Sequence, residues 1–379
     1  MAQPAYSPGL EGVIAGETAI STITDEGLFY RGYFIQDLAE KCTFEEVAHL
    51  LICGELPSRT QLEEFRARLN EHRCLGPATL ALLRHIPPAT PPMDMLRTAV
   101  SFLGHFDPEA QDLTTEANQR KAVRLLASVP TVIGVWFQMQ QGREPLAPRP
   151  ELSHAGNLLY LITGEPPSAT AQRVMDLSLI LYAEHEFNAS TFAARVTVST
   201  MADLHCGIVS AIGALKGPWH GGANEQAMEM MLEIGDPERA EAWVMDALAR
   251  KERIMGFGHR VVRRGDLRAR LLTEAGRQLA EQAGEYRWLR MAETMERVME
   301  REKGLKPNVD FPCGWVYYML GLPVAAYTPI FVAARIAGWS AHISEQLAHN
   351  RIIRPRSLYT GPARRPVPPL EERGTGQVR

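Results

Sequence analysis

The stretch Lys216–Glu225, KGPWHGGANE, interrupts a helical pattern and places His220 between Trp219 and two glycines. Pro218 and the glycines predict a turn, which is followed directly by an apolar repeat of Ala227, Met230, Met231 and Ile234. We therefore expect Asn224 or one of the glycines to open a helix. A helix N-terminus favours a neutral imidazole or a nearby anion at His220. Taken by itself, the stretch also fits a histidine in an ordinary surface loop.

The composition is that of a globular protein. A chain of 379 residues predicts two domains, or one large domain with a lobe. The formal net charge of −4 gives no basic footprint for nucleic acid. The five cysteines are widely spaced without a C-x-x-C pair, which favours a reducing cytoplasm over disulfides and gives no zinc signature. The N-terminus lacks the features of a secretory signal, and no continuous apolar run approaches 18 residues. We expect a soluble, cytoplasmic protein that does not span a membrane.

Helical periodicity dominates the chain after the first 35 residues. Short β-like pieces come first, at 12–15, 18–23 and 28–30. A capping box at Thr43–Glu46 and an N-terminal signal at Ser58 open the first helices, the second of which runs to about Arg73. Further helical patterns cover roughly 93–105, 115–141, 151–163, 168–184, 191–213, 223–235, 238–251, 266–282, 286–302 and 327–350. The sequence therefore predicts a large all-α protein with short N-terminal β pieces and no fixed-period repeat.

Several common catalytic motifs do not occur. The sequence has no G-x-x-x-x-G-K-[ST], no G-x-G-x-x-G after a strand, no H-E-x-x-H and no G-x-S-x-G. Phosphate-loop, dinucleotide, zinc-hydrolase and serine-hydrolase chemistries are accordingly disfavoured.

Four further segments place polar residues in contexts rich in glycine or aromatic residues. They are 183–191, 255–268, 306–311, and 334–342 followed by 351–357. One carboxylate, Asp310, and two histidines in glycine turns, His220 and His259, suit the removal of a proton α to a carbonyl and stabilisation of the enolate. Arginines bind carboxylates in a bidentate way, so the pattern points to a substrate that carries carboxylates.

Each of these residues also has a plain structural interpretation when it is taken alone. For Asp310 the interpretation is a helix cap, and for Arg335 it is a solvated helix face or an ion pair with Glu345 or another carboxylate. For His259 it is a turn, for His185 a core position, and for Arg351, Arg354 and Arg356 a solvated basic tail.

Together, these segments make the sequence resemble a citrate synthase of the shorter bacterial and archaeal kind. The resemblance covers most of the chain in order, through PGLEGVIAGETAIS (8–21), LFYRGYFIQDLAE (28–40), FEEVAHLLICGELP (44–57), HEFNASTFAARV (185–196), GALKGPWHGGANE (213–225), RIMGFGHRV (253–261), PNVDF (307–311), ARIAGWSAHISEQ (334–346) and RIIRPRSLYTGP (351–362). It implies an almost wholly helical fold, with a large domain at 1–221 and 325–379 and a small domain at 222–324. Closure of the small domain would assemble the acetyl-CoA site.

The resemblance also implies a role for each matching residue. His220 would stabilise the enol of acetyl-CoA, Asp310 would take the methyl proton, and His259 would polarise the ketone of oxaloacetate. The groups that would hold oxaloacetate are His185, Arg268, Arg335 and Arg354, the last supplied across the interface of a homodimer. Coenzyme A would enter as a thioester substrate, so no separate cofactor and no metal is expected. We place the CoA contacts at Gly256, Phe257, Gly258, Arg260, Lys306 and Asn308.

The sequence departs from the family pattern near the proposed base. Pro312-Cys313 stands where the family usually has Tyr-Ser, so we expect Cys313 to be a thiol exposed to the site. Leu267 replaces a usual proline before Arg268, and Trp219 and Val262 replace a usual Leu and Tyr. Three alternatives stay open: a 2-methylcitrate synthase that uses propionyl-CoA, a lyase that cleaves citryl-CoA, and a weakly active helical paralogue with a regulatory or binding role.

Overall fold

The computed structural model describes residues 6–258 and 265–373. These residues form sixteen α-helices and one small antiparallel sheet, which confirms the predicted all-α class. They fall into two units: a main unit of residues 18–352, and a second unit of residues 6–17 and 353–373. The second unit contains two short 3-10 turns, Pro8–Leu10 (η1) and Leu370–Glu372 (η5). The predicted division into a large and a small domain at 222–324 stays a prediction.

Helices account for most of the main unit. Their bounds are Ile35–Lys41 (α1), Phe44–Cys53 (α2), Arg59–His72 (α3), Pro77–His85 (α4), Pro92–Leu103 (α5), Thr115–Gln140 (α6), His154–Thr163 (α7), Ala169–Tyr182 (α8), Ala189–Val198 (α9), Leu204–Leu215 (α10), Ala223–Ile234 (α11), Ala240–Ala249 (α12), Leu267–Ala283 (α13), Arg287–Lys303 (α14), Asp310–Met319 (α15) and Tyr327–Ala348 (α16). Three 3-10 turns, Gly104–Phe106 (η2), Pro237–Arg239 (η3) and Val324–Ala326 (η4), lie between them.

The predicted helix starts are confirmed by their side-chain bonds. At the start of α2, the Thr43 N–H donates to Glu46 Oε2 at 2.7 Å. At the start of α3, the Gln61 N–H donates to Ser58 Oγ at 3.3 Å, and the Ser58 N–H donates to Gln61 Oε1 at 2.9 Å. These reciprocal bonds satisfy N–H groups that the first turn of a helix leaves without partners.

The single helix predicted over 191–213 is wrong, because the chain folds there as α9 and α10. Met201 adopts a left-handed conformation with φ of 69° between the two helices. Asp203 then starts α10, since its Oδ1 accepts a hydrogen bond from the Cys206 N–H at 3.0 Å. The prediction also missed α1 and α4, the second of which begins with a proline at its first position.

The β-like pieces near the N-terminus form one three-stranded sheet in the order β1-β2-β3. Its strands are Ser21–Ile23 (β1), Leu28–Tyr30 (β2) and Tyr33–Phe34 (β3), and β1 pairs with β2 in antiparallel register, Ser21 opposite Tyr30. Residues 12–15, which were expected to be β-like, form no strand. The sheet is small, but β1 contacts the loop after α8, where one candidate residue lies.

One helix, α6, is long and apolar enough to cross a membrane by length and composition. Sequence inspection finds no continuous apolar run of this length, yet an 18-residue window of α6 reaches a mean hydropathy of 1.4. Within the described residues, 89% of that window is buried against other parts of the chain. Helix α6 therefore has the surroundings of a core helix.

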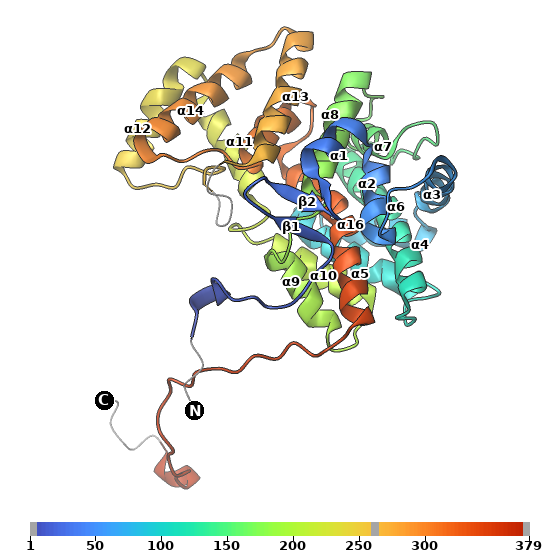
Figure 1. Ribbon diagram of the computed structural model, residues 1–379, viewed down its shortest axis with the longest axis vertical. Helices are drawn as coiled ribbons and strands as arrows, with labels where there is room; N and C mark the ends of the chain where they lie inside the picture. Colours follow the sequence, from blue (N-terminus) through green and yellow to red (C-terminus); the bar gives the residue numbers. More distant parts are fainter. Residues whose placement is uncertain (1–5, 259–264, 374–379) are drawn as a thin grey trace. The chain divides into compact units, whose positions relative to one another are not determined.

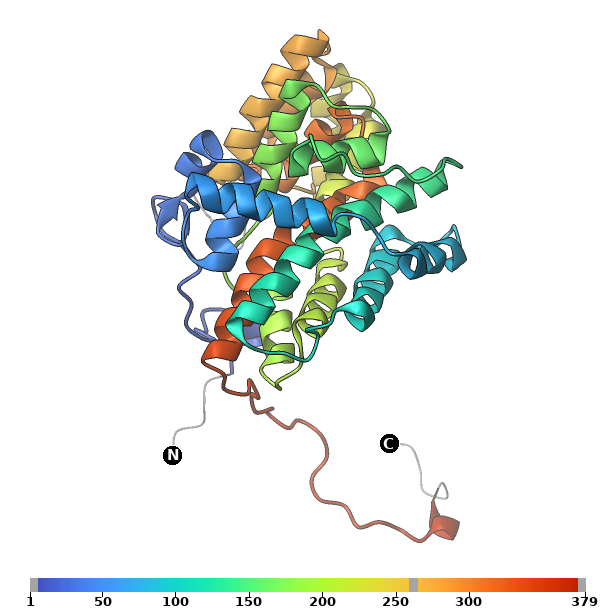
Figure 2. The same cartoon turned by 90° about the vertical axis from the view of Figure 1, so that its right-hand side faces the viewer.

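Helix α16 forms the centre of the main unit. It packs against α2, α6, α8, α9 and α10, and Figures 1 and 2 show it running beside α6. Helices α11, α12, α13 and α14 gather at one end of this unit (Figure 1), and α15 packs against both α11 and α13. The candidate residues come from the places where these groups meet: the end of α8, the middle of α16, the start of α15 and the turn before α11.

Candidate active site

Arg335 lies in the middle of α16 and is 2% exposed. Its Nε donates to the main-chain carbonyl oxygen of Tyr182 at 2.6 Å, and its guanidinium carbon lies 4.6 Å from the centre of the Phe331 ring. Burial lowers the pKa of this guanidinium from its usual value. Its Nη1 is buried without a hydrogen-bond partner among the described residues. A buried cation with an unused donor is suited to binding an anion.

The plain interpretations of Arg335 are wrong. Its burial excludes a solvated helix face, and Glu345 forms its ion pair with Arg195 at 2.7 Å. Among the described residues, Arg335 forms no ion pair with another carboxylate either.

His220 lies in the turn between α10 and α11. Gly222 is the N-cap residue of α11, as predicted. Its Nε2 lies 2.8 Å from Ser190 Oγ and accepts the main-chain N–H of Ser190 at 3.3 Å. A main-chain N–H can only donate, so Nε2 carries no proton and the neutral ring has its proton on Nδ1. Burial, reinforced by the charge of Arg335, lowers the pKa of His220 to about 4. His220 is therefore neutral near pH 7, and it is not an ordinary surface-loop histidine.

Gly221 allows the turn to bring His220 back against the helix. The Gly221 N–H donates to the carbonyl oxygen of Leu215 at 2.9 Å, and a Cβ at this position would lie only 2.5 Å from the same oxygen. Any side chain at position 221 would push the turn away from the end of α10.

Asp310 is the first residue of α15. Its N–H donates to Asn308 Oδ1 at 3.0 Å, and its Oδ1 accepts the hydroxyl of Tyr182 at 2.7 Å. Its side chain makes no capping bond, so the interpretation of Asp310 as a helix cap is wrong. Burial raises the pKa of Asp310 to about 6, while Tyr182 and Arg268 act to lower it. A carboxyl group with this pKa is a base that can work near neutral pH.

Phe331 brings these groups together. Its ring lies 4.2 Å from the ring of Tyr182 and 6.3 Å from the ring of His220, between centroids, and it carries the guanidinium of Arg335 on its face. Tyr182 in turn holds Asp310. The structure thus gathers a neutral imidazole, a buried guanidinium and a carboxyl group with a raised pKa around one aromatic ring.

Arg268 already has a partner. It is 5% exposed, and its Nε and Nη2 donate to the two carboxylate oxygens of Asp266 at 3.0 and 2.8 Å. Asp266 Oδ2 also accepts the N–H of Val309 at 3.1 Å. Asp266 therefore ties the start of α13 to the residue that precedes Asp310, and it takes two of the donors of Arg268.

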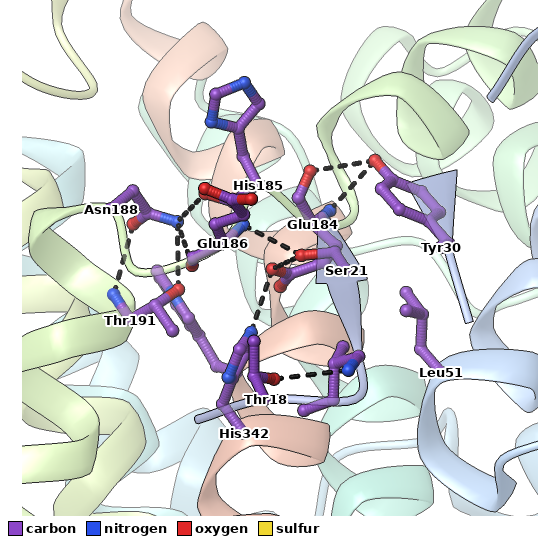
Figure 3. Close-up of polar contacts among 12 residues, drawn as sticks. Thr18, Ser21, Tyr30, Leu51, Glu184, His185, Glu186, Asn188, Thr191 and His342 are labelled. Atoms are coloured by element: carbon purple, nitrogen blue, oxygen red, sulfur yellow. Dashed lines mark hydrogen bonds and ion pairs between the residues drawn. The ribbon is translucent and has the colours of Figure 1, made fainter. Parts of the chain in front are cut away.

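His185 lies in the loop after α8, and the residues beside it anchor that loop. Glu184 is fully buried, and its Oε1 accepts hydrogen bonds from Ser21 Oγ and His342 Nε2, both at 2.9 Å (Figure 3). Glu186 Oε1 accepts the N–H of Ile23 at 2.7 Å.

The ring of His185 points away from these bonds in Figure 3. His185 is half-buried rather than a core residue, so its interpretation as a core histidine is wrong. The anchored neighbours hold in place the stretch of main chain that carries His185.

The two segments predicted to contact CoA lie side by side. The Gly258 N–H donates to the Lys306 carbonyl oxygen, and the Asn308 N–H donates to the Gly256 carbonyl oxygen, both at 2.9 Å. The Asn308 side-chain amide donates to the Gly258 carbonyl oxygen at 2.9 Å. The ring of Phe257 lies 4.5 Å from that of Phe311, the residue after Asp310. These segments therefore adjoin the proposed base, with Lys306 exposed.

His259 and Arg260 lie outside the described residues. Arg354 belongs to the second unit, where its side chain is exposed.

The expected exposure of Cys313 is wrong. Its side chain is fully buried on α15, the amide nitrogen of Asn224 lies 3.9 Å from its Sγ, and burial raises the pKa of its thiol. Pro312 is tolerated because it lies in the first turn of α15, where its missing N–H breaks no helical bond. Among the described residues, no group of three His, Cys, Asp or Glu side chains is placed to hold a metal ion.

Sequence reasoning missed Tyr182, Ser190 and Phe331. Ser190 lies within the HEFNASTFAARV stretch (185–196) but was given no role, and no motif marks Tyr182 or Phe331. The contacts of all three depend on how α8, α9 and α16 meet. The available signal was their position, since Tyr182 and Ser190 flank the HEFNA segment and Phe331 lies one turn before Arg335.

Comparison with known proteins decides the family. The family model described as citrate synthase, C-terminal domain, matches residues 9–356. This chain belongs to the citrate synthase family. It is 47% identical over 374 residues to 2-methylcitrate synthase 1 of Corynebacterium glutamicum, with 96% of this chain and 98% of that protein covered. It is 45% identical over 366 residues to citrate synthase 2 of Bacillus subtilis, with 96% and 98% covered.

Solved citrate synthase structures share the fold. The enzyme of Pyrobaculum aerophilum superimposes with a TM-score of 0.89 at 39% identity, covering 97% of this chain and 95% of that one. The citrate synthase of Thermoplasma acidophilum, in a ternary complex with carboxymethyl coenzyme A and oxaloacetate, gives a TM-score of 0.91 at 31% identity, covering 98% of this chain and 100% of that one. The helical citrate synthase fold predicted for this chain is thereby confirmed.

Proposed function

We propose that this citrate synthase family enzyme condenses acetyl-CoA with oxaloacetate and water to give citrate and CoA. The cluster around Phe331 is the observation that carries the proposal, because it combines a base, a neutral hydrogen-bond donor and a site for an anion. The family relationship and the complex of the Thermoplasma acidophilum enzyme support the same substrates.

The first step is enolisation of the thioester. The Asp310 carboxylate takes a proton from the methyl group of acetyl-CoA, and the Nδ1–H of His220 donates to the thioester oxygen as negative charge develops there. A neutral imidazole with its proton on Nδ1 is the form that can donate in this way, and the bond from Ser190 to Nε2 supports that tautomer. The enol carbon then attacks the ketone carbon of oxaloacetate. His259 would polarise this ketone and pass a proton to its oxygen as the carbon–carbon bond forms.

Oxaloacetate would be held by cationic and imidazole groups. Arg335 offers a buried Nη1 for a carboxylate, and Arg268 would bind with the donors that Asp266 does not engage. His185, in its anchored loop, would contact the ketoacid as well. Guanidinium groups suit this task because their planar donors match a carboxylate.

Coenzyme A would bind at the paired segments beside α15. The predicted contacts are Gly256, Phe257, Gly258, Arg260, Lys306 and Asn308. CoA enters as part of the substrate, and we propose that the reaction uses no resident cofactor. After condensation, hydrolysis of citryl-CoA in the same site would release citrate and CoA.

The active form is proposed to be a cytoplasmic homodimer, with Arg354 supplied to the site of the partner subunit. This proposal is supported by the exposed C-terminal segment that carries Arg354, in which Leu358 and Tyr359 are 65% and 74% exposed. Apolar residues exposed along an extended segment favour contact with another surface.

A second candidate is 2-methylcitrate synthesis from propionyl-CoA. The observation that favours it is the 47% identity to 2-methylcitrate synthase 1 of Corynebacterium glutamicum. One extra methylene changes selectivity by only about 1–3 kcal/mol, so small differences in the acyl pocket decide between the two substrates.

The test follows thiol release from acetyl-CoA and from propionyl-CoA, each with and without oxaloacetate. A citrate synthase gives the higher kcat/KM with acetyl-CoA, and a 2-methylcitrate synthase gives it with propionyl-CoA. Oxaloacetate-independent thiol release, or none with either thioester, contradicts the condensing function. Cleavage of citryl-CoA without net synthesis of citrate would instead indicate the lyase. Binding of the substrates without turnover would indicate the regulatory paralogue.

A further inference from the structure

Tyr182, the last residue of α8, contacts the candidate active site through its hydroxyl, its main chain and its ring. Its buried hydroxyl donates to Asp310 Oδ1 at 2.7 Å, and its main-chain carbonyl oxygen accepts from Arg335 Nε at 2.6 Å. Its ring packs against Phe331 with the centroids 4.2 Å apart. One residue therefore contacts both the proposed base and the proposed carboxylate-binding group.

We propose that Tyr182 is a positioning residue for the base: it holds Asp310 through Oδ1, so that Oδ2 is the oxygen that accepts the substrate proton. The inference rests on the proposed function for the role of Asp310. An ionised carboxylate can only accept, so the hydrogen in this bond belongs to the phenol. A carboxylate fixed through one oxygen presents the other in a defined direction, which brings the reacting atoms into line.

Burial keeps Tyr182 in its donor form. The side chain is 1% exposed, and burial together with the Asp310 charge raises the pKa of the phenol well above its usual value. The phenol therefore remains protonated wherever the protein is folded near neutral pH, and the bond to Asp310 persists as the carboxyl ionises.

Within residues 6–258 and 265–373, the groups that face Asp310 come from four elements. They are Tyr182 from α8, Asp266 and Arg268 at the start of α13, Arg335 from α16, and Cys313 from its own helix α15. Among those that lower the pKa of Asp310, Tyr182 has the largest effect and is the one that can be changed without removing a charge.

The variant Tyr182→Phe isolates the hydroxyl. It keeps the ring against Phe331 and the main-chain carbonyl that holds Arg335. Loss of a hydrogen bond to a charged group corresponds to about one to two pKa units, so the acid limb of kcat/KM for the CoA thioester should move up by that much. Activity should fall about two- to tenfold at pH 7 and recover at pH 9, with the KM for oxaloacetate unchanged.

A matched control is available in Tyr317→Phe. The Tyr317 hydroxyl is also buried, but it lies 2.7 Å from Ser178 Oγ and makes no bond to Asp310. This variant should lose a similar amount of thermal stability while the midpoint of the acid limb stays in place. The inference is overturned when Tyr182→Phe leaves the midpoint unchanged, or when Tyr317→Phe moves it equally.

A second readout needs no turnover. The Asp310 carboxyl can be titrated by carbon-13 NMR in the free protein, with its signal assigned by its loss in Asp310→Asn. Its pKa should rise in Tyr182→Phe and not in Tyr317→Phe. If the wild-type protein releases no thiol but the pKa of Asp310 still rises in Tyr182→Phe, the proposed function is refuted and the contact between Tyr182 and Asp310 is supported. Full activity with an unshifted Asp310 refutes the inference and leaves the proposed function standing.

Discussion

At the residue scale, burial moves the two proposed acid–base groups in opposite directions. It raises the pKa of Asp310 to about 6 and, with help from Arg335, lowers that of His220 to about 4. Burial disfavours the charged form of each group, which is the anion for Asp310 and the cation for His220. Above pH 6 the free protein therefore combines a carboxylate with a neutral imidazole, the two states that enolisation requires.

The pH dependence of kcat/KM follows from these states. This parameter reports the free enzyme, so its acid limb should have a midpoint near pH 6, set by protonation of Asp310. His220 should add no further loss until the pH approaches 4. Initial rates at low thioester concentration between pH 4.5 and 8.5 measure the profile. A midpoint near 4, the ordinary value for a carboxyl group, would contradict the assignment.

Replacing Asp310 with asparagine tests the base directly. The amide oxygen of Asp310→Asn can still accept the Tyr182 hydroxyl, but the group can no longer take a proton. We expect kcat to fall by about 10²–10⁴-fold. Oxaloacetate binding, measured by calorimetry, should stay within error of the wild-type value, and unchanged turnover would remove Asp310 from the mechanism.

A second buried carboxyl group should govern stability rather than activity. Asp176 Oδ1 accepts the Phe44 N–H at 3.0 Å, and burial with the nearby Glu45 raises the pKa of Asp176 to about 7. The folded chain then binds this proton more tightly than the unfolded chain. The contribution of Asp176 to the free energy of unfolding is therefore complete below about pH 4 and is lost as the pH rises through 7. Between pH 5 and 8, the free energy of unfolding of the wild-type protein, measured with denaturant, should fall relative to that of Asp176→Asn. Parallel plots of this free energy against pH for the two proteins would contradict the prediction.

Single residues also mark the limit of what the sequence could predict. His220, Asp310 and Arg335 were predicted as site residues because polar residues between glycines and apolar residues are unusual. The pairing of Arg268 with Asp266 and the bond from Tyr182 to Asp310 were not found, since short-range pattern carries no information on which helices meet. The burial of Cys313 likewise depends on the packing of α11 against α15.

At the scale of elements, close contact between helices should decide how much an added side chain changes the free energy of unfolding. A Cβ at Gly338 of α16 would lie 2.2 Å from Glu184 Oε2 and 2.4 Å from the Ala183 carbonyl oxygen, whereas a Cβ at Gly213 of α10 would meet nothing within 4 Å. Gly338→Ala should cost about 1–3 kcal/mol of unfolding free energy, and Gly213→Ala should add about 0.5–1 kcal/mol. Urea unfolding measures both, and equal effects would contradict the packing.

Elements with strong local signals were predicted, and those without were not. The capping residues of α2 and α3 satisfy their own helix starts, so sequence alone located them. The break between α9 and α10 was missed because both helices are apolar and the interruption is only five residues long, at 199–203. Its one local signal is Asp203, a preferred helix-capping residue, and the prediction did not use it.

At the scale of the whole molecule, the proposed sharing of Arg354 has a specific consequence for mixed dimers. Arg354→Ala and Arg335→Ala should each abolish most activity as homodimers, because every site then lacks one guanidinium. In a mixed dimer, the subunit that keeps Arg335 receives an intact Arg354 from its partner, so one of the two sites is complete. Random mixing should restore roughly one quarter of wild-type activity, since half of the dimers are mixed and each has one complete site.

The control for this experiment is a mixture in which both subunits carry Arg354→Ala, which leaves no complete site. Differently tagged subunits allow the mixed dimers to be purified and counted before assay. If Arg354 acted within its own subunit, each site of a mixed dimer would still lack one arginine, and purified mixed dimers would be as inactive as either parent. Recovery therefore depends on the exposed C-terminal segment reaching a second copy of the chain, which no feature of a single subunit can replace.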